Sequence, residues 1–290
     1  MEELEFNVGT LFDTGPVQAQ VPRKKTTNFR AGFQIYYNSA LAWRIWFFMA
    51  FSDIRRRYQR TILGPFWVTL SNAIFIGSMG VIFPFLWHTD MKSYLPFFSS
   101  SYIIWTFISS MTTEACGVFV DASSLIKQTS LPYSVYANNV VLRNFIVLLH
   151  HLTVYFIIVL IFSVPICLNT LLFIPGMMIL CLTGSWLCIL LGFITSRYRD
   201  TRQLVASILQ ISMFITPIFW SPSQLGTSTK ARLLVELNPL HHFIQIVRAP
   251  LMGQLPAMHD WLITSAICII GLLMTLRLFG KYKKHLVFWL

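Results

Sequence analysis

The chain has 290 residues, of which 55% are hydrophobic and only 11% are charged. Because soluble domains carry about a quarter charged residues, this composition excludes an ordinary soluble protein and predicts an all-α integral membrane protein. The net charge of +11 does not indicate nucleic acid, since the basic residues lie between apolar stretches rather than in one patch.

The chain divides into three segments. Residues 1–28 are rich in acidic, Gly, Pro, Thr and Gln residues and lack a basic region followed by an apolar core, so we expect a poorly ordered cytoplasmic tail rather than a signal peptide. Residues 29–65 contain ALAWRIWFFMAFS (40–52), which is too short to cross a membrane but suits a helix lying along its surface. Residues 66–290 form the transmembrane domain.

Four arginines precede the first apolar stretch, at positions 55, 56, 57 and 60 (Arg55, Arg56, Arg57 and Arg60). At lipid headgroup level they fit two interpretations. One is a plain positive anchor that fixes the orientation of the chain. The other is a docking site for a phosphate-bearing lipid headgroup, because guanidinium groups match phosphate oxygens.

Six stretches are apolar enough to cross a bilayer, which takes about 20 helical residues. They are Phe66–Trp87, Pro96–Val120, Tyr136–Ser163, Leu171–Thr195, Gln203–Ser221 and Trp261–Gly280. An even number places both ends on one side. Sixteen Lys and Arg residues lie on that side and four in the opposite loops, so we expect both termini in the cytoplasm.

Polar and aromatic side chains recur at helical spacing in three of these stretches. These side chains are Trp67, Ser71, Phe75 and Ser78 in the first, Tyr102, Thr106, Ser109, Ser110 and Thr113 in the second, and Gln210 and Phe214 in the fifth. Such stripes can hold helices together, as we expect for Gly184, Cys188 and Gly192 in the fourth. Three stripes in one chain favour a hydrated path, and hydroxyls beside aromatic rings would suit a sugar.

Two stretches contain ionisable residues at matching depth. Glu114 and Arg143 each lie about 10 Å inside neighbouring antiparallel helices, at 1.5 Å per residue. Because an isolated charge is expensive there, we predict that the two side chains form an ion pair or share a hydrogen-bond network. His150 and His151 lack a third ligand and are expected to pack rather than bind metal.

The sequence lacks the motifs of common enzymes. It has no phosphate-binding GxxxxGK[ST] loop, no GxSxG and no HExxH, so we expect no catalytic residue, no metal and no cofactor bound by this chain. None of the five cysteines forms a CxxC pair, and we expect buried, reduced thiols. Uphill transport would therefore need another subunit or an ion gradient.

Two loops are predicted to form helices. In residues 123–131, Ser123 or Ser124 can cap a short helix that Pro132 ends, and this helix is either a lever for a partner or an ordinary connector. In residues 229–256, two amphipathic helices are expected to lie on or dip into the outer leaflet, the second capped by Asn238 with Pro239 at its first position. These helices would form a lid over an exit.

Three segments carry a resemblance to a known family: RRRYQRTILGPFWVTLSNAI (55–74), FISSMTTEACGVFVDASSLIKQTSLPYSV (107–135) and LNPLHHFIQIVRAPLMG (237–253). They resemble the permease subunit of O-antigen (lipopolysaccharide) exporters, within the type-2 ABC permeases. The resemblance implies a homodimer in the bacterial inner membrane. It also implies two copies of a separate ATPase, which hold ATP and Mg, and an undecaprenyl-diphosphate-linked polysaccharide as cargo.

The resemblance also implies roles for particular residues. The four arginines would flank the entrance for the lipid diphosphate, the polar stripes would line the channel, and membrane lipids would surround the protein. The ATPase-coupling residues would be Ser124, Leu125, Ile126, Lys127, Gln128 and Leu131, and the periplasmic gate would include Asn238, Pro239, Phe243 and Arg248. The alternatives are a permease of this type for capsule, teichoic acid, lipid, haem or drug, a polyprenyl-sugar transferase using Glu114 or a histidine as base, and an ion-driven transporter.

Overall fold

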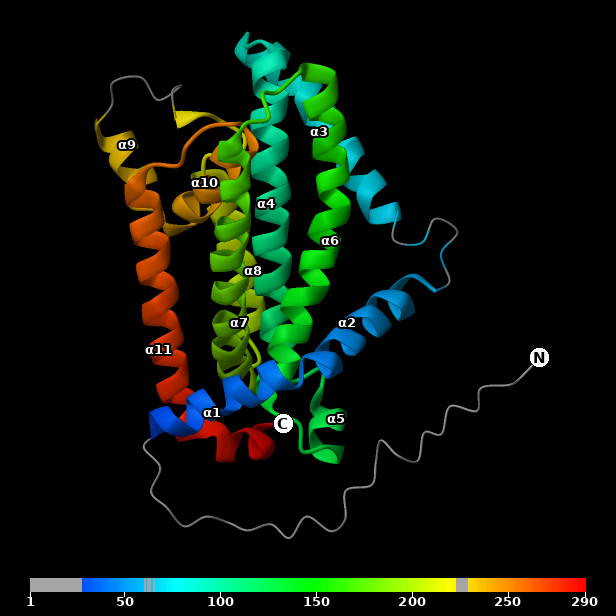
Figure 1. Ribbon diagram of the computed structural model, residues 1–290, viewed down its shortest axis with the longest axis vertical. Helices are drawn as coiled ribbons and strands as arrows, with labels where there is room; N and C mark the ends of the chain where they lie inside the picture. Colours follow the sequence, from blue (N-terminus) through cyan, green and yellow to red (C-terminus); the bar gives the residue numbers. More distant parts are fainter. Residues whose placement is uncertain (1–27, 60, 62–63, 65, 223–228) are drawn as a thin grey trace, which may run out of the picture.

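A computed structural model describes residues 28–59, 61, 64, 66–222 and 229–290, and the secondary structure of these residues is helical, without strands (Figure 1). The tail predicted at residues 1–28 lies outside the described residues except for Asn28. Both ends of the described chain, Asn28 and Leu290, lie at the end of the molecule that also contains α5 (Ser123–Gln128) (Figure 1). We call this the α5 end and the opposite one the α10 end.

The segment predicted to lie along the membrane forms two helices rather than one. Helices α1 (Asn28–Leu41) and α2 (Trp43–Tyr58) run across the α5 end of the bundle, crosswise to the long helices (Figure 1). Large apolar side chains remain exposed on both, including Phe48 and Leu41. Such exposure is expected of helices that lie in a membrane surface.

Six helices run along the length of the bundle: α3 (Phe66–Trp87), α4 (Met91–Gly117), α6 (Tyr133–Phe162), α7 (Phe173–Arg197), α8 (Thr201–Ile215) and α11 (Met258–Trp289). Within the described residues, four segments are long and apolar enough to cross a membrane, namely Phe66–Trp87, Tyr133–Phe162, Leu168–Arg197 and Met258–Lys281. The third includes the short 3-10 helix Leu168–Leu172. Helices α4 and α8 are not among these four segments, so the total of six membrane spans stays a prediction.

Helix α8 is shorter than predicted. It has 15 residues, about 22 Å at 1.5 Å per residue, and ends at Ile215 instead of continuing to Ser221. The cause is Pro217, which disfavours a helical conformation at the preceding residue, and Thr216 is indeed extended. Residues 216–222 therefore form an irregular segment at the α10 end.

Helix α4 lies at the centre of the fold and packs against α3, α6, α7, α8 and α10. Its middle is fully buried around Phe98, Ile103 and Met111. Helix α7 packs so closely against this region that a side chain at Gly184 would overlap Met111, and one at Gly192 would overlap Val118 and Phe119. The predicted packing role of these glycines is confirmed.

The short helices at the two ends differ from the predictions in detail. Helix α5 has Ala122 at its N-cap with no side-chain hydrogen bond, so the predicted serine cap is wrong, and it ends at Gln128, before Pro132 is reached. Helix α9 is Thr229–Glu236 and α10 is Pro239–Leu251, with Asn238 capping α10 as predicted. Most of α10 is buried between α4, α7 and α11, so it does not lie on a membrane surface.

Candidate functional site

A cavity of about 980 Å³ opens at the α5 end among α2, α4, α5, α6 and α8. We call it the basic pocket, and its charged lining residues are Arg56, Arg57, Arg143, Arg202, Asp53, Glu114 and Asp121. Four arginines and three carboxylates give the lining an excess of positive charge. Because α5 contributes Ser124 and Leu125, the pocket also adjoins the short helix predicted to contact a partner.

Arg143 is the centre of the charge network in this pocket. Its guanidinium contacts two carboxylates, with Nη2 2.8 Å from Glu114 Oε2 and Nη1 2.9 Å from Asp53 Oδ2. Arg57 Nη2 lies 3.0 Å from the other oxygen of Glu114. The predicted contact between Glu114 and Arg143 is therefore present, and pairing lowers the cost of charges at this depth.

Two amides complete the network. Asn139 donates to Asp53 Oδ2 at 2.9 Å, and Asn144 donates to Glu114 Oε2 at 2.7 Å. Since Asp53 belongs to α2, Glu114 to α4 and Arg143 to α6, the network joins the crosswise helix to two long helices. Sequence reasoning missed Asp53, although an acidic residue three positions before Arg56 was a usable signal.

The structure separates the arginines that were predicted as one group. Arg56 and Arg57 line the basic pocket, whereas Arg55 does not. Arg56 pairs with Asp53 at 3.0 Å, in the same helix. Arg60 lies outside the described residues. Only part of the arginine cluster therefore faces the cavity.

Helix α5 divides the residues predicted to couple to a partner. Ile126 is buried against the bundle, whereas Ser124, Lys127 and Gln128 are exposed, and Leu125 and Leu131 are half-buried. Figure 1 shows α5 projecting at the end of the bundle beside α2. The exposed side chains are thus available for a partner, and the buried one fixes the helix.

Some residues of the predicted channel stripes lie on the protein surface and others are half-buried. Exposed positions are Trp67, Ser71, Ser78, Ser110, Thr113, Gln210 and Phe214, and half-buried ones are Phe75, Tyr102, Thr106 and Ser109. Ser99, three residues before Tyr102 in α4, is fully buried. Its hydroxyl donates to a carbonyl of its own helix, which explains how it is tolerated in the core.

Aromatic stacking joins the stripes of α3 and α4. Phe75 stacks on Tyr102 with ring centroids 4.6 Å apart, and Phe98 continues the stack to Phe219 at 5.4 Å. Phe214 of α8 stacks on Phe219 at 6.0 Å. The irregular segment after α8 therefore connects all three stripes, which sequence spacing alone did not show.

Arg248 of α10 is buried, with an exposed fraction of 3%. Its Nη1 donates to Ser101 Oγ at 3.0 Å and to the carbonyl of Pro217 at 2.8 Å, while its Nε donates to Gln245 at 3.1 Å. The guanidinium also lies 4.4 Å from the Phe97 ring centroid. No salt bridge among the described residues involves Arg248, so neutral acceptors hold this cation.

Next to it, His242, His259 and Asp260 place three possible metal-ligand atoms within 4.8 Å of one another. Sequence reasoning did not single out this cluster. His242 Nδ1 lies 2.6 Å from Asp260 and Nε2 lies 2.8 Å from the carbonyl of Glu236. An oxygen of the protein faces each ring nitrogen of His242, so hydrogen bonding within the chain accounts for the position of this ring without a metal.

Three of the five cysteines are buried as predicted. All five are free, and Cys116, Cys188 and Cys268 are buried. Cys181 is half-buried, but Cys167 is exposed, because it precedes the short 3-10 helix at the α10 end. The prediction of burial is wrong for Cys167.

Comparison with known proteins shows which family the chain belongs to. The sequence pattern of the family described as "ABC-2 type transporter" matches residues 50–252, which include α3 to α10 and most of α2. The chain belongs to the ABC-2 type transporter family. This ABC-2 permease is a multi-pass membrane protein of transport rather than a catalytic enzyme.

The chain is also similar in sequence to a known export permease. The O-antigen export system permease protein RfbA of Myxococcus xanthus is 20% identical over 189 residues, covering 65% of this chain and 72% of the relative. The match supports a type-2 ABC permease. At this identity, the cargo of the relative does not transfer by itself.

Proposed function

We propose that this ABC-2 permease exports a polyprenyl-diphosphate-linked polysaccharide of the O-antigen kind across the bacterial inner membrane. The observation that carries the proposal is the basic pocket, a large cavity at membrane-surface level whose arginines exceed its carboxylates. A diphosphate is a dense anion, and arginine recognises phosphate oxygens through paired N–H donors. The proposed orientation has the α5 end in the cytoplasm, as the Lys and Arg distribution indicates.

Arg57 is the residue best placed to receive the diphosphate. Its side chain is 50% exposed and pairs with Glu114, whereas Arg143 is 15% exposed and contacts two carboxylates. An arriving phosphate can replace Glu114 as the partner of Arg57 without removing Arg143 from its carboxylates. The network thus offers a cation for the cargo and keeps its structural core.

The path of the sugar is proposed along α3, α4 and α8. No residue of α8 is buried, and the polar side chains of Ser71, Ser110 and Gln210 are exposed at membrane depth. Exposed polar groups are unfavourable against lipid and are expected to face a protein partner or water. A second copy of this chain, packed on this side, would enclose a channel lined by hydroxyls and aromatic rings.

Energy is proposed to come from two copies of a separate ATPase. Helix α5 supplies exposed Ser124, Lys127 and Gln128 as a contact for it, next to the basic pocket. ATP and Mg would be held by that partner. A movement of α5 would then act directly on the cavity that holds the diphosphate.

The transferase alternative is disfavoured by the environment of Glu114. This carboxylate contacts Arg57 and Arg143 and accepts a hydrogen bond from Asn144. A carboxylate held by two cations is a weak base, which is the opposite of what proton abstraction needs. Other polymers carried on a lipid diphosphate remain compatible with the same pocket.

The proposal is tested by ATPase turnover of this chain co-purified with its ATPase, with and without a polyprenyl-diphosphate-linked glycan. We expect a stable complex that is stimulated by the glycan. The double variant Arg56→Gln/Arg57→Gln should lower this stimulation about tenfold or more, since a charge-assisted hydrogen bond contributes about 1.5–3 kcal/mol. Arg55→Gln is the matched control, because Arg55 lies in the same helical turn outside the pocket.

Three outcomes decide the proposal. Loss of stimulation in the double variant alone supports diphosphate recognition by the pocket. Equal loss in Arg55→Gln would show that surface charge, not the pocket, attracts the cargo. Full stimulation of the double variant would exclude the basic pocket as the diphosphate site.

A further inference from the structure

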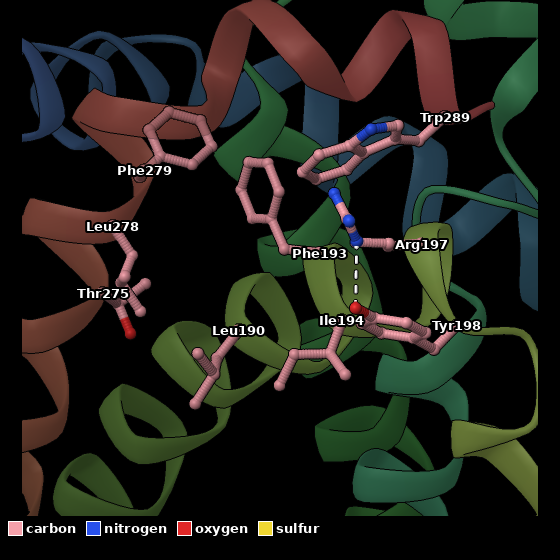
Figure 2. Close-up of a pocket in the computed structure, with 9 residues that line it drawn as sticks. All are labelled: Leu190, Phe193, Ile194, Arg197, Tyr198, Thr275, Leu278, Phe279 and Trp289. Atoms are coloured by element: carbon pink, nitrogen blue, oxygen red, sulfur yellow. Dashed lines mark hydrogen bonds between the residues drawn. The ribbon is translucent and has the colours of Figure 1, made fainter.

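A second cavity at the α5 end lies away from the basic pocket, between α7 and α11 (Figure 2). Its volume of about 460 Å³ is within the range of cavities that hold small molecules. Most of its lining is apolar, including Leu190, Phe193, Leu278 and Phe279, and one cation, Arg197, lines it as well. We call it the α7–α11 pocket, and none of its lining residues belongs to the basic pocket.

Aromatic rings flank Arg197 on two sides. Its guanidinium carbon lies 5.5 Å from the ring centroid of Trp289 and 5.4 Å from that of Tyr198 (Figure 2). The Nε donates a hydrogen bond to Tyr198 Oη at 3.1 Å. Among the described residues, no salt bridge or other hydrogen bond engages the two terminal nitrogens, so the cation is oriented but lacks an anion.

The apolar part of the pocket extends from Arg197 into the bundle. Leu190 precedes Arg197 by seven residues of α7, which is about 10 Å along the helix axis. Arg197 is the last residue of a candidate membrane span, so its guanidinium lies at the level of lipid phosphates. Leu190 then lies at the level of acyl chains.

The pocket offers little to a ligand that is polar throughout. Thr275 contributes a buried hydroxyl with no hydrogen-bond partner among the described residues. The deeper lining residues Leu190, Phe193, Ile194, Leu278 and Phe279 have no polar side-chain atoms. A sugar or nucleotide would lose its hydrogen bonds with water there. An amphipathic anion fits, with its charge at Arg197 and its hydrocarbon inside.

We infer that the α7–α11 pocket binds an anionic glycerophospholipid from the surrounding leaflet. The phosphate contacts the terminal nitrogens of Arg197, between the rings of Trp289 and Tyr198. One acyl chain occupies the apolar part lined by Leu190, Ile194 and Leu278. Phe193 and Phe279, in edge-to-face contact with centroids 5.3 Å apart, form one wall of it. This site is independent of the proposed cargo, because it uses different residues on different helices.

The full-length chain is reconstituted into vesicles of phosphatidylglycerol or phosphatidylcholine with brominated acyl chains, which quench tryptophan fluorescence on contact. Trp289 lines the pocket, so the part of the quenching lost in Trp289→Phe reports this site. We expect phosphatidylglycerol to be preferred about fivefold, because one basic residue at the membrane surface contributes about this factor. Arg197→Gln should reduce the preference to about one.

Arg199→Gln is the matched control, since Arg199 is exposed, two residues away, and outside the pocket. Retained preference in this variant supports the site, and an equal loss would overturn it in favour of general surface charge. An unchanged preference in Arg197→Gln would also overturn it.

Leu190→Phe tests the acyl chain separately by narrowing the apolar part while keeping Arg197. We expect weaker quenching of Trp289 by both lipids, and unchanged quenching would show that no chain enters the pocket. Inorganic phosphate, which has no hydrocarbon, should not relieve the quenching. If it does so at millimolar concentration, the pocket binds phosphate alone and the lipid assignment is wrong.

Discussion

The two ends of the molecule hold arginines of low exposure in opposite ways. At the α5 end, Arg143 contacts Asp53 and Glu114 and borders a cavity of about 980 Å³. At the α10 end, Arg248 is 3% exposed and is held by a serine, a glutamine and a backbone carbonyl. The first arrangement pairs charge with charge beside water, and the second surrounds charge with neutral acceptors.

This difference separates a network that can change partners from one that is fixed. A carboxylate that contacts two arginines can release the exposed one to another anion and still balance the buried one. The donors of Arg248 join α10 to α4 and to the segment after α8, and a third hydrogen bond lies within α10. Moving this side chain would break all three bonds at once. We therefore expect exchange at the α5 end and rigidity at the α10 end.

The largest expected effect is that of Arg143→Gln. The change leaves Asp53 and Glu114 without their shared cation, and removal of one partner from a largely buried ion pair destabilises a protein by about 3 kcal/mol. The measurement is thermal unfolding followed by a thiol-reactive dye, because Cys116 and Cys188 are buried until the chain unfolds. Arg199→Gln serves as the control, and an unshifted midpoint in Arg143→Gln would contradict the central role of this residue.

The next effect is that of Arg248→Lys. A lysine retains the charge but cannot reach Gln245, Ser101 and Pro217 together or stack its plane on Phe97. We expect a loss of about 2 kcal/mol in the free energy of unfolding, since buried acceptors lose their donors. The same replacement at the exposed Arg57 should change stability little, and equal losses at both positions would remove the distinction between the two ends.

The stability of the α10 end should depend on pH through His241. Burial, with a smaller contribution from the nearby charges of Arg248 and His242, lowers the pKa of His241 from its usual 6.5 to about 4. Between these pH values the unfolded chain binds a proton that the folded chain does not, so stability falls as the pH falls from about 6.5 towards 4. His241→Gln should remove up to about 1.4 kcal/mol per pH unit of this slope.

The control for this measurement is His88→Asn. His88 is exposed and has a positive φ of 50°, which asparagine tolerates. Unfolding midpoints of the three proteins at pH 4.5, 5.5 and 7 separate the contribution of His241 from those of the carboxylates. Parallel curves for the native chain and His241→Gln would show that this histidine titrates normally.

Much of the membrane architecture follows from the sequence because it depends on local properties. Apolar length identifies α3, α6, α7 and α11, and equal depth in neighbouring helices predicts the contact between Glu114 and Arg143. The contribution of Asp53 did not follow, because it depends on how α2 lies across α4 and α6. The burial of Arg248 did not follow from the sequence either, since the pattern of α10 is typical of an amphipathic surface helix.

Arg248 is buried in part because α8 ends early, at Ile215. Once Pro217 stops that helix at Ile215, the chain turns back and its carbonyl accepts a hydrogen bond from Arg248. The proline is visible in the sequence, but the position of its carbonyl is set by long-range packing. The same segment carries Phe219, which joins the aromatic stacks of α3, α4 and α8.

The smallest expected effect on stability gives the sharpest comparison, because it concerns the two arginines on one carboxylate. Arg57 has a half-exposed side chain, and such ion pairs contribute about 0–1 kcal/mol, so Arg57→Gln should shift the unfolding midpoint far less than Arg143→Gln. Salt should reduce the Arg57 contribution further, because exposed pairs are screened at about 0.5 M ionic strength and buried pairs much less. Unfolding at low and high salt measures both variants side by side. If Arg57→Gln destabilises the protein as much as Arg143→Gln at either salt concentration, Arg57 is a fixed structural residue and cannot exchange Glu114 for a phosphate.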